Sequence, residues 1–100
     1  MYTTKENTYN ISITKTVEVV PTNRQKSFYG KAKEITDDAG NVYLQSYETI
    51  VCGITASGIF NRLWDGYSKT TMLHVIAFCD AHGISCGGAQ WWKSLLTHTL

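Results

Sequence analysis

The residues best suited to chemistry lie near the end of the sequence, where two thiols flank an imidazole. Cys79, His82 and Cys86 are separated by two and three residues, a spacing that could supply three ligands to a tetrahedral zinc ion. No fourth ligand is evident nearby, and Cys79 also continues an apolar helical stripe. A disulfide between the two cysteines is the alternative, but cytosolic disulfides seldom persist. We therefore predict buried, reduced thiols and neither a metal nor a cofactor.

Two histidines form a second candidate group. His74, Phe78 and His82 recur at a spacing of four, so on a helix they would share one face that could bind a ligand or transfer a proton. The simpler interpretation is the partly exposed flank of an amphipathic helix. No metalloprotease motif, nucleophile elbow or phosphate-binding glycine loop accompanies them. We therefore predict no catalytic residues and a protein that is not an enzyme.

The third group combines tyrosines with lysines on two neighbouring segments. Interleaved aromatic rings and lysines can stack on bases and contact phosphates, as in single-stranded nucleic-acid platforms. Tyrosine and lysine are equally common on any exposed antiparallel face. Trp91 is a further candidate, because aromatic side chains often anchor protein interfaces. We predict that the binding residues are Tyr29, Lys31, Lys33, Tyr43, Tyr47 and Trp91, and that Gln45 accompanies the hairpin residues.

Alternating apolar and polar residues predict the strands that would position this third group. In the first strand, Tyr9 to Val20, apolar residues recur every second position, so one face should be buried. Lys15 interrupts that face and indicates a strand at the sheet edge. Turn residues separate the further strands, predicted at 25–36, 42–54 and 59–64. The result is a four-stranded, mainly antiparallel sheet.

The turn Asp37 to Asn41 sets the register of the central hairpin. If Thr36 stands opposite Val42, small residues gather on one face, which we take as the core side, and the tyrosines and lysines lie on the other. The core-side pairs would be Phe28 with Ile50, Ala32 with Ser46, and Glu34 with Leu44. The outer pairs would be Tyr29 with Thr49, Lys31 with Tyr47, and Lys33 with Gln45.

Two helices should complete the domain. Ser68 or Thr70 can cap a main helix that runs to His82. A shorter helix is expected over 89–96, with Trp92 as an anchor. The fold class is therefore α+β: a single domain over residues 1–100, with the sheet packed by one main helix and a short C-terminal helix.

Composition narrows the possible partners and location. Nine Lys and Arg against eight Asp and Glu give a net charge of +1, so no global field favours nucleic acid or an anionic membrane. No apolar run reaches transmembrane length, and residues 1–7 lack the features of a signal peptide. We predict a cytosolic protein with no membrane partner. The sequence leaves the oligomeric state open.

Three short segments resemble a family of small uncharacterised proteins carried by phages and mobile elements of Gram-positive bacteria. They are Ser27 to Ala32, Tyr43 to Val51, and Gly66 to Met72 followed by His74-Val75. The resemblance covers roughly residues 26–78. Where the pattern usually has an arginine-histidine pair, this chain has Leu73-His74, so a role for that basic pair is in doubt.

The resemblance implies a viral context and a location in the bacterial host cytoplasm. Small phage proteins without catalytic residues often bind a host complex and block a defence assembly, as anti-CRISPR proteins do. We therefore predict a non-enzymatic protein that binds a host macromolecule. The alternative is a small single-stranded nucleic-acid-binding module that uses the tyrosine-lysine hairpin face.

Overall fold

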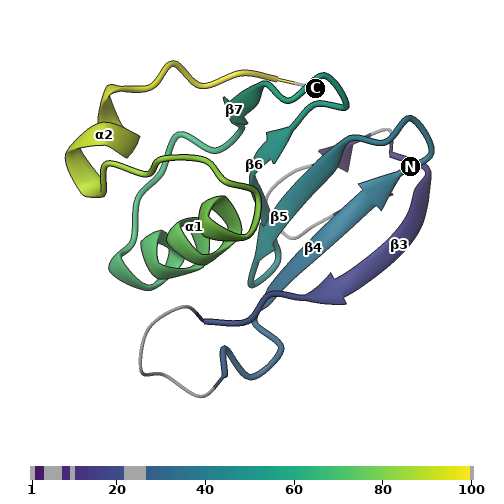
Figure 1. Cartoon of the computed structure of the whole chain (residues 1–100), viewed down its shortest axis with the longest axis horizontal. Coiled ribbons are helices and arrows are strands. Elements are labelled where there is room, and N and C mark those ends of the chain that lie inside the picture. The colour runs from purple at the N-terminus through teal and green to yellow at the C-terminus, as the bar shows by residue number, and fades with distance from the viewer. Residues whose placement is uncertain (1, 4–7, 10, 22–26, 100) are drawn as a thin grey trace.

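The computed structural model describes residues 2–3, 8–9, 11–21 and 27–99 of the chain. Its main sheet has five antiparallel strands in sequence order: β3 (Ile13–Glu18), β4 (Ala32–Asp37), β5 (Val42–Ser46), β6 (Thr49–Ile54) and β7 (Phe60–Arg62). A separate two-stranded sheet pairs β1 (Tyr2–Thr3) with β2 (Thr8–Tyr9). The helices α1 (Lys69–Ala81) and α2 (Ala89–Ser94) follow, and α1 lies across one face of the main sheet (Figure 1). The α+β class is confirmed.

The strand predicted at 42–54 is in fact a hairpin, so the main sheet has five strands and not four. The chain reverses at Tyr47 and Glu48, where Tyr47 has a φ of 56°. This turn contains none of the glycine, asparagine or proline residues that usually mark a two-residue reversal. Alternation of side chains alone therefore gave the appearance of one long strand.

The register of the β4–β5 hairpin is confirmed along its whole length. Thr36 pairs with Val42, Glu34 with Leu44, Lys33 with Gln45 and Ala32 with Ser46. Beyond Ala32, the predicted pairs of Phe28 with Ile50 and Tyr29 with Thr49 are wrong, because β4 begins at Ala32 and residues 29–30 form a turn, whereas Lys31 still lies opposite Tyr47 and accepts its N–H bond. The part of the predicted strand at residues 25–26 lies outside the described residues.

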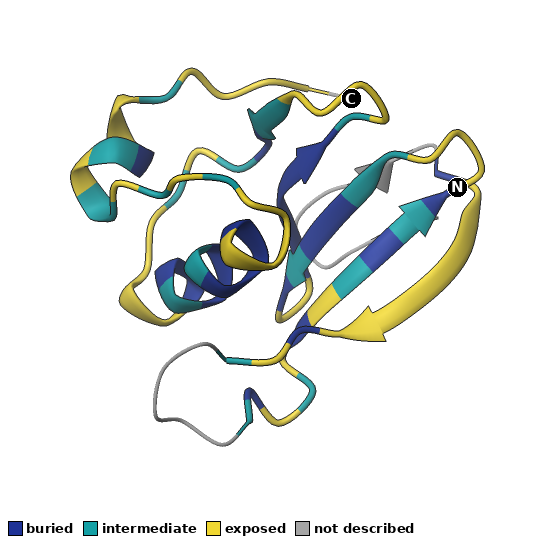
Figure 2. Ribbon diagram, viewed as in Figure 1, coloured by how far each residue is buried: buried dark blue, intermediate teal, exposed yellow. Residues whose placement is uncertain are grey.

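The edge position of β3 is confirmed, but its predicted burial is wrong. All six residues of the strand are exposed, as Figure 2 shows. Only Ile11 and Val19, which flank the strand, are buried among the apolar residues described in this segment. Of the predicted strand 9–20, Tyr9 belongs to β2 and residue 10 lies outside the described residues.

The core consists of two clusters on opposite faces of the sheet, since neighbouring residues of a strand point to opposite sides. Leu44 belongs to the cluster beneath α1, together with Phe78 and Trp92. Its neighbour Tyr43 belongs to the second cluster, whose buried members are Ile11, Ile35, Tyr43, Ile50 and Leu63. Ala32 and Ser46 lie buried on the α1 side, as the small residues of the core face predict.

The helices lie close to their predicted ranges. Ser68 caps α1, because its hydroxyl accepts a hydrogen bond from the backbone N–H of Thr71 at 3.0 Å. The shorter helix ends two residues early, at Ser94, and Trp92 is its buried anchor as predicted. Across the described part of the chain, no helix has the length and apolar character needed to span a membrane.

Candidate functional site

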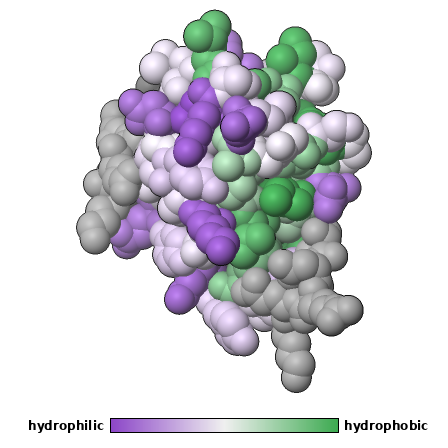
Figure 3. Space-filling model, turned by 90° about the vertical axis from the view of Figure 1, so that its left-hand side faces the viewer, coloured by the Kyte–Doolittle hydropathy of each residue, from purple (hydrophilic) through white to green (hydrophobic). Residues whose placement is uncertain are grey.

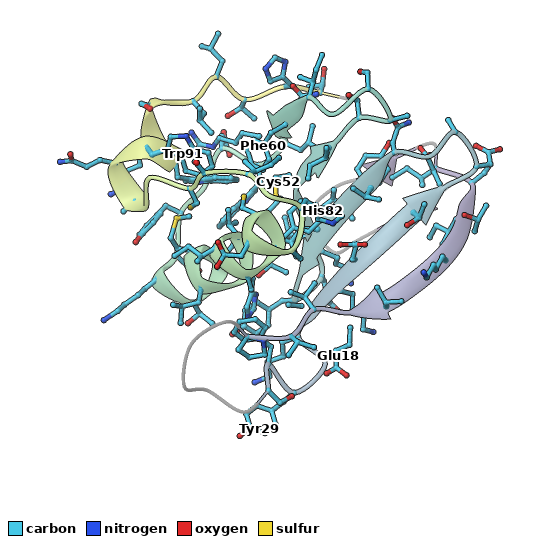
Figure 4. The ribbon with its side chains drawn as sticks, in the orientation of Figure 1. Glu18, Tyr29, Cys52, Phe60, His82 and Trp91 are labelled. Carbon is cyan, nitrogen blue, oxygen red and sulfur yellow. The ribbon has the colours of Figure 1, made fainter. Side chains whose placement is uncertain are left out.

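Two neighbouring turns meet at the lower end of the sheet and form the rim of the candidate site. The N–H of Lys31 donates to the Phe28 carbonyl at 3.0 Å, and the Lys31 carbonyl accepts from the N–H of Tyr47 at 2.7 Å. Tyr29 is three-quarters exposed and extends away from the body of the protein (Figure 4). The Lys31 ammonium lies 5.7 Å from the centre of the Tyr47 ring. We refer to Tyr29, Lys31 and Tyr47 as the rim.

A cavity of about 610 Å³ opens beside the rim, between the β5–β6 turn and the start of α1. We refer to it as the pocket. Its walls include two aromatic rings and four serine or threonine side chains, together with one cationic and one anionic residue. The lining residues are Gly30, Lys31, Ser46, Tyr47, Glu48, Thr49, Val51, Trp64, Ser68 and Thr71.

Buried hydrogen bonds join the pocket wall to α1. The Ser46 hydroxyl lies 2.9 Å from the Thr71 hydroxyl and 2.8 Å from Nδ1 of His74. The His74 ring also packs edge-on against Phe28, with ring centres 4.5 Å apart. Burial, with a smaller effect from the Lys31 charge, lowers the pKa of His74, so the neutral imidazole is favoured. Ser46, Thr71 and His74 therefore form a neutral, hydrogen-bonded wall.

A serine bonded to a histidine invites comparison with a catalytic pair. Ser46 is only 2% exposed, and its hydroxyl is held by both Thr71 and His74. Among the described residues, no carboxylate hydrogen-bonds to His74 to orient it as a base. The arrangement fits a structural wall of a binding pocket better than a nucleophile.

The structure separates Tyr43 from the other predicted binding residues. Tyr43 is buried in the second core cluster, where its hydroxyl donates to Oδ2 of Asp37 at 3.0 Å. Burial, together with the Asp37 hydrogen bond and charge, raises the pKa of Tyr43 to about 12. Its ring lies over Gly53, where an added Cβ would come within 2.9 Å of Cδ1 of Tyr43. The predicted open tyrosine-lysine face therefore does not form around Tyr43.

The aspartate that receives this bond closes the β4–β5 turn. Burial alone would raise the pKa of Asp37, but hydrogen bonds from Asn41, Tyr43 and the Ala39 backbone hold it below the usual value. The two Asp37 oxygens accept from the N–H groups of Ala39 and Asn41 and from the Asn41 amide. Asp37 and Tyr43 thus act together as part of the fold.

The remaining predicted binding residues lie apart from the pocket. Lys33 is exposed beside Gln45, outside the pocket lining. Trp91 is half-buried, with its ring centre 5.5 Å from that of Phe60 in β7 (Figure 4). This contact holds α2 against the sheet, so we assign Trp91 to packing. Only Tyr29, Lys31 and Tyr47 of the predicted set come together.

The predicted face of α1 that carries both histidines is buried at His74 and Phe78 and exposed at its end, at His82. His74 and Phe78 are at most 1% exposed. His82 lies near the helix end, where its Nε2 is 2.5 Å from a Glu34 carboxylate oxygen. Within the described ranges, no group of three or more His, Cys, Asp or Glu residues could hold a metal ion. Cys79, His82 and Cys86 therefore do not form the zinc site that their spacing could have supplied.

Sequence reasoning missed most of the pocket. Ser46 was expected only as a small core residue, and Ser68 only as a cap, while Thr49, Trp64 and Thr71 received no functional role. The available signal was the pair of hydroxyl residues at the start of α1, Ser68 and Thr71, because the start of a helix can face a ligand. The hairpin at Tyr47, which brings Ser46 and Thr49 to the same place, could not be read from turn residues.

A family model described as "Family of unknown function (DUF8033)" matches residues 16–94, so the chain belongs to this family. The match includes the rim, the pocket and both helices of the fold. No curated protein and no solved structure matches the chain.

Proposed function

We propose that this member of the DUF8033 family is a binding protein without catalytic chemistry, and that it docks on a host protein through its rim. Under this proposal the protein comes from a phage or mobile element and acts in the host bacterial cytoplasm. Inhibition of a defence complex is the specific role that we propose. The sequence resemblance over residues 26–78 supports the bacterial host.

The observation that carries the proposal is the backbone conformation of two rim tyrosines. Tyr29 and Tyr47 have φ values of 53° and 56°, and they are the described residues other than glycine with positive φ. This region favours glycine and asparagine, and a bulky side chain there costs about 1–3 kcal/mol. Both side chains are exposed. Large aromatic side chains at two adjacent strained positions are expected where they serve recognition and not folding.

The composition of the rim favours a protein over a nucleic acid. Lys31 is accompanied by the acidic Glu48 in the pocket wall, so the surface has no single-sign charge to track a phosphate backbone. Burial of Tyr43 also removes one of the rings that base stacking would have used. Figure 3 shows hydrophilic and hydrophobic side chains interspersed over one side of the molecule. Exposed tyrosines in a mixed surface are typical of protein interfaces.

The test begins with capture of a host protein and ends with purified components. The captured protein should be identified by mass spectrometry, purified, and titrated against the wild type and the Tyr29→Asn and Tyr47→Asn variants. We expect each variant to weaken binding by about tenfold, the loss typical of an interface anchor. Leu96→Ala is the control, because Leu96 is exposed outside the pocket lining, and it should bind like the wild type.

A parallel salt titration with labelled single-stranded DNA and RNA examines the other class of partner. Steep salt-dependent binding that weakens in a Lys31→Gln, Lys33→Gln double variant would support a nucleic-acid module and overturn the protein proposal. Equal binding of the partner by the wild type and both tyrosine variants would also overturn it.

A further inference from the structure

We propose that the pocket receives a single carboxylate of the partner protein, carried on an acidic side chain. This inference rests on the binding role proposed above and names the group that the pocket recognises. The donors are the Lys31 ammonium and the hydroxyls of Thr49, Ser68 and Thr71, all of which belong to the pocket lining. Hydroxyl and ammonium donors that line one cavity suit an anion.

Thr49 offers the pocket a hydroxyl that is free to bind a ligand. It is only 7% exposed, it lines the pocket, and its hydroxyl has no hydrogen-bond partner among the described residues. The oxygen itself is not among the buried unpaired side-chain atoms of the described residues, where Gln45 Oε1 stands instead, so the Thr49 hydroxyl faces the open pocket and can bond to what enters it. An oxygen atom from a bound group would satisfy it.

The buried hydroxyl chain can direct a second donor into the pocket. When the neutral His74 carries its proton on Nδ1, it donates to Ser46, Ser46 donates to Thr71, and the Thr71 proton is free for a ligand. The Ser68 hydroxyl already accepts from the Thr71 N–H, so its own proton can also be donated. An acceptor in the pocket therefore finds hydroxyl donors from β6 and from the start of α1.

The charges around the pocket select the kind of anion. Lys31 attracts a negative group, while Glu48 opposes a second negative charge close by. A carboxylate with one charge is therefore favoured over a phosphate with nearly two. The cavity of about 610 Å³ has room for an acidic side chain with its neighbours, and the rings of Tyr47 and Trp64 offer apolar walls to those neighbours.

The test is a titration of isotope-labelled protein with capped tripeptides, followed by two-dimensional NMR of the backbone amides. The peptides differ only in their central residue, which is glutamate, glutamine or phosphoserine, and a fourth peptide carries only a free C-terminal carboxylate. We expect glutamate to bind about tenfold more tightly than glutamine, and to shift amides at residues 46–49 and 68–71. Phosphoserine should bind more weakly than glutamate, and the C-terminal carboxylate should bind no better than glutamine.

Thr49→Val keeps the shape of the side chain and removes its hydroxyl, so it should weaken the glutamate peptide about fivefold. Thr70→Val is the matched control, because Thr70 is exposed on α1 and outside the lining, and it should change nothing. Equal affinity for glutamate and glutamine, no binding of either, or an unchanged Thr49→Val variant would overturn the carboxylate inference. If binding of the partner protein is still weakened by the Tyr29→Asn and Tyr47→Asn variants, the proposed function stands even when the carboxylate inference is overturned. If those variants bind the partner like the wild type, the proposed function is wrong, whichever peptide binds.

Discussion

At the scale of single residues, the rim tyrosines Tyr29 and Tyr47 adopt a positive φ that residues with bulky side chains normally avoid. Glycine and asparagine tolerate positive φ because they avoid or offset the clash between Cβ and the backbone. Tyr29 makes this conflict easiest to measure, since it is three-quarters exposed and contributes little packing. Its backbone stays anchored in the turn by the bond between its N–H and the Ser27 hydroxyl, at 2.8 Å.

Replacing Tyr29 with asparagine should therefore leave the fold as stable or make it more stable. We expect the free energy of unfolding to rise by up to about 1 kcal/mol, because asparagine tolerates the left-handed conformation better. Denaturant unfolding followed by circular dichroism measures the change. A loss of more than about 1 kcal/mol would mean that the tyrosine ring supports the fold, which would weaken the argument from strain.

His74 should make stability depend on pH. Burial and the Lys31 charge lower the pKa of His74 below 6.5, whereas the unfolded chain takes up its proton near that value. The unfolded state then binds more protons, so stability is fully present above pH 6.5 and is lost as the pH falls from there to the lower pKa of the folded state. The loss has a slope of at most about 1.4 kcal/mol per pH unit.

Unfolding measurements between about pH 7.5 and 5, for the wild type and His74→Gln, isolate this contribution from other groups that titrate nearby. Glutamine can still hydrogen-bond to Ser46 but does not titrate, so its stability should depend less steeply on pH. Parallel curves for the two proteins would show that His74 takes no part.

At the scale of the elements, helices and strands were predicted best where a turn or cap residue in the sequence agreed with the pattern of buried side chains. The β4–β5 register follows from the Asp37 to Asn41 turn, and α1 follows from the Ser68 cap and its apolar stripe. The break between β5 and β6 could not be predicted, because its turn is made by Tyr47 and Glu48 and not by typical turn residues. The exposure of β3 could not be predicted either, because its apolar residues alternate as in a half-buried strand. The pocket depends on the turn between β5 and β6, since Ser46 and Thr49 lie side by side only after the chain reverses there.

Arg62 connects two elements of the fold in a way that the alternation of apolar and polar residues could not predict. Its buried guanidinium donates to the carbonyls of Trp64, Gly66, Trp92 and Leu95, and it stacks 4.8 Å from the Trp92 ring. These bonds satisfy carbonyls at the end of α2, a helix too short to be stable alone. The Arg62 side chain thus joins strand β7 to helix α2, in addition to the contact between Phe60 and Trp91.

Arg62→Lys should loosen α2, because an ammonium cannot reproduce the planar fork of donors. We expect a loss of about 1–3 kcal/mol in the free energy of unfolding, as carbonyls near Trp92 lose their partners. Hydrogen exchange of the α2 amides should quicken. Gln90→Ala, on the same helix and exposed, is the control and should stay within about 0.5 kcal/mol of the wild type.

At the scale of the whole molecule, one sheet separates two core clusters that must be stable together. Leu44 contacts the cluster beneath α1, and Ile50 lies in the cluster on the other face, yet β5 and β6 are paired strands. Loss of either cluster removes the apolar cover from one side of the same hydrogen-bonded strands. The two clusters should therefore unfold in one cooperative step, as is usual for domains of this size.

Leu44→Ala and Ile50→Ala test this cooperativity from opposite faces. Both side chains are fully buried, so each truncation should cost about 2–5 kcal/mol. Tryptophan fluorescence follows the first cluster, which contains Trp92, whereas far-ultraviolet circular dichroism follows the whole backbone. In both variants the two signals should change at one denaturant concentration, although Ile50 lies on the face away from Trp92. If Ile50→Ala lowers the circular dichroism midpoint while the fluorescence midpoint stays in place, the two faces are independent units and the single-domain prediction is wrong.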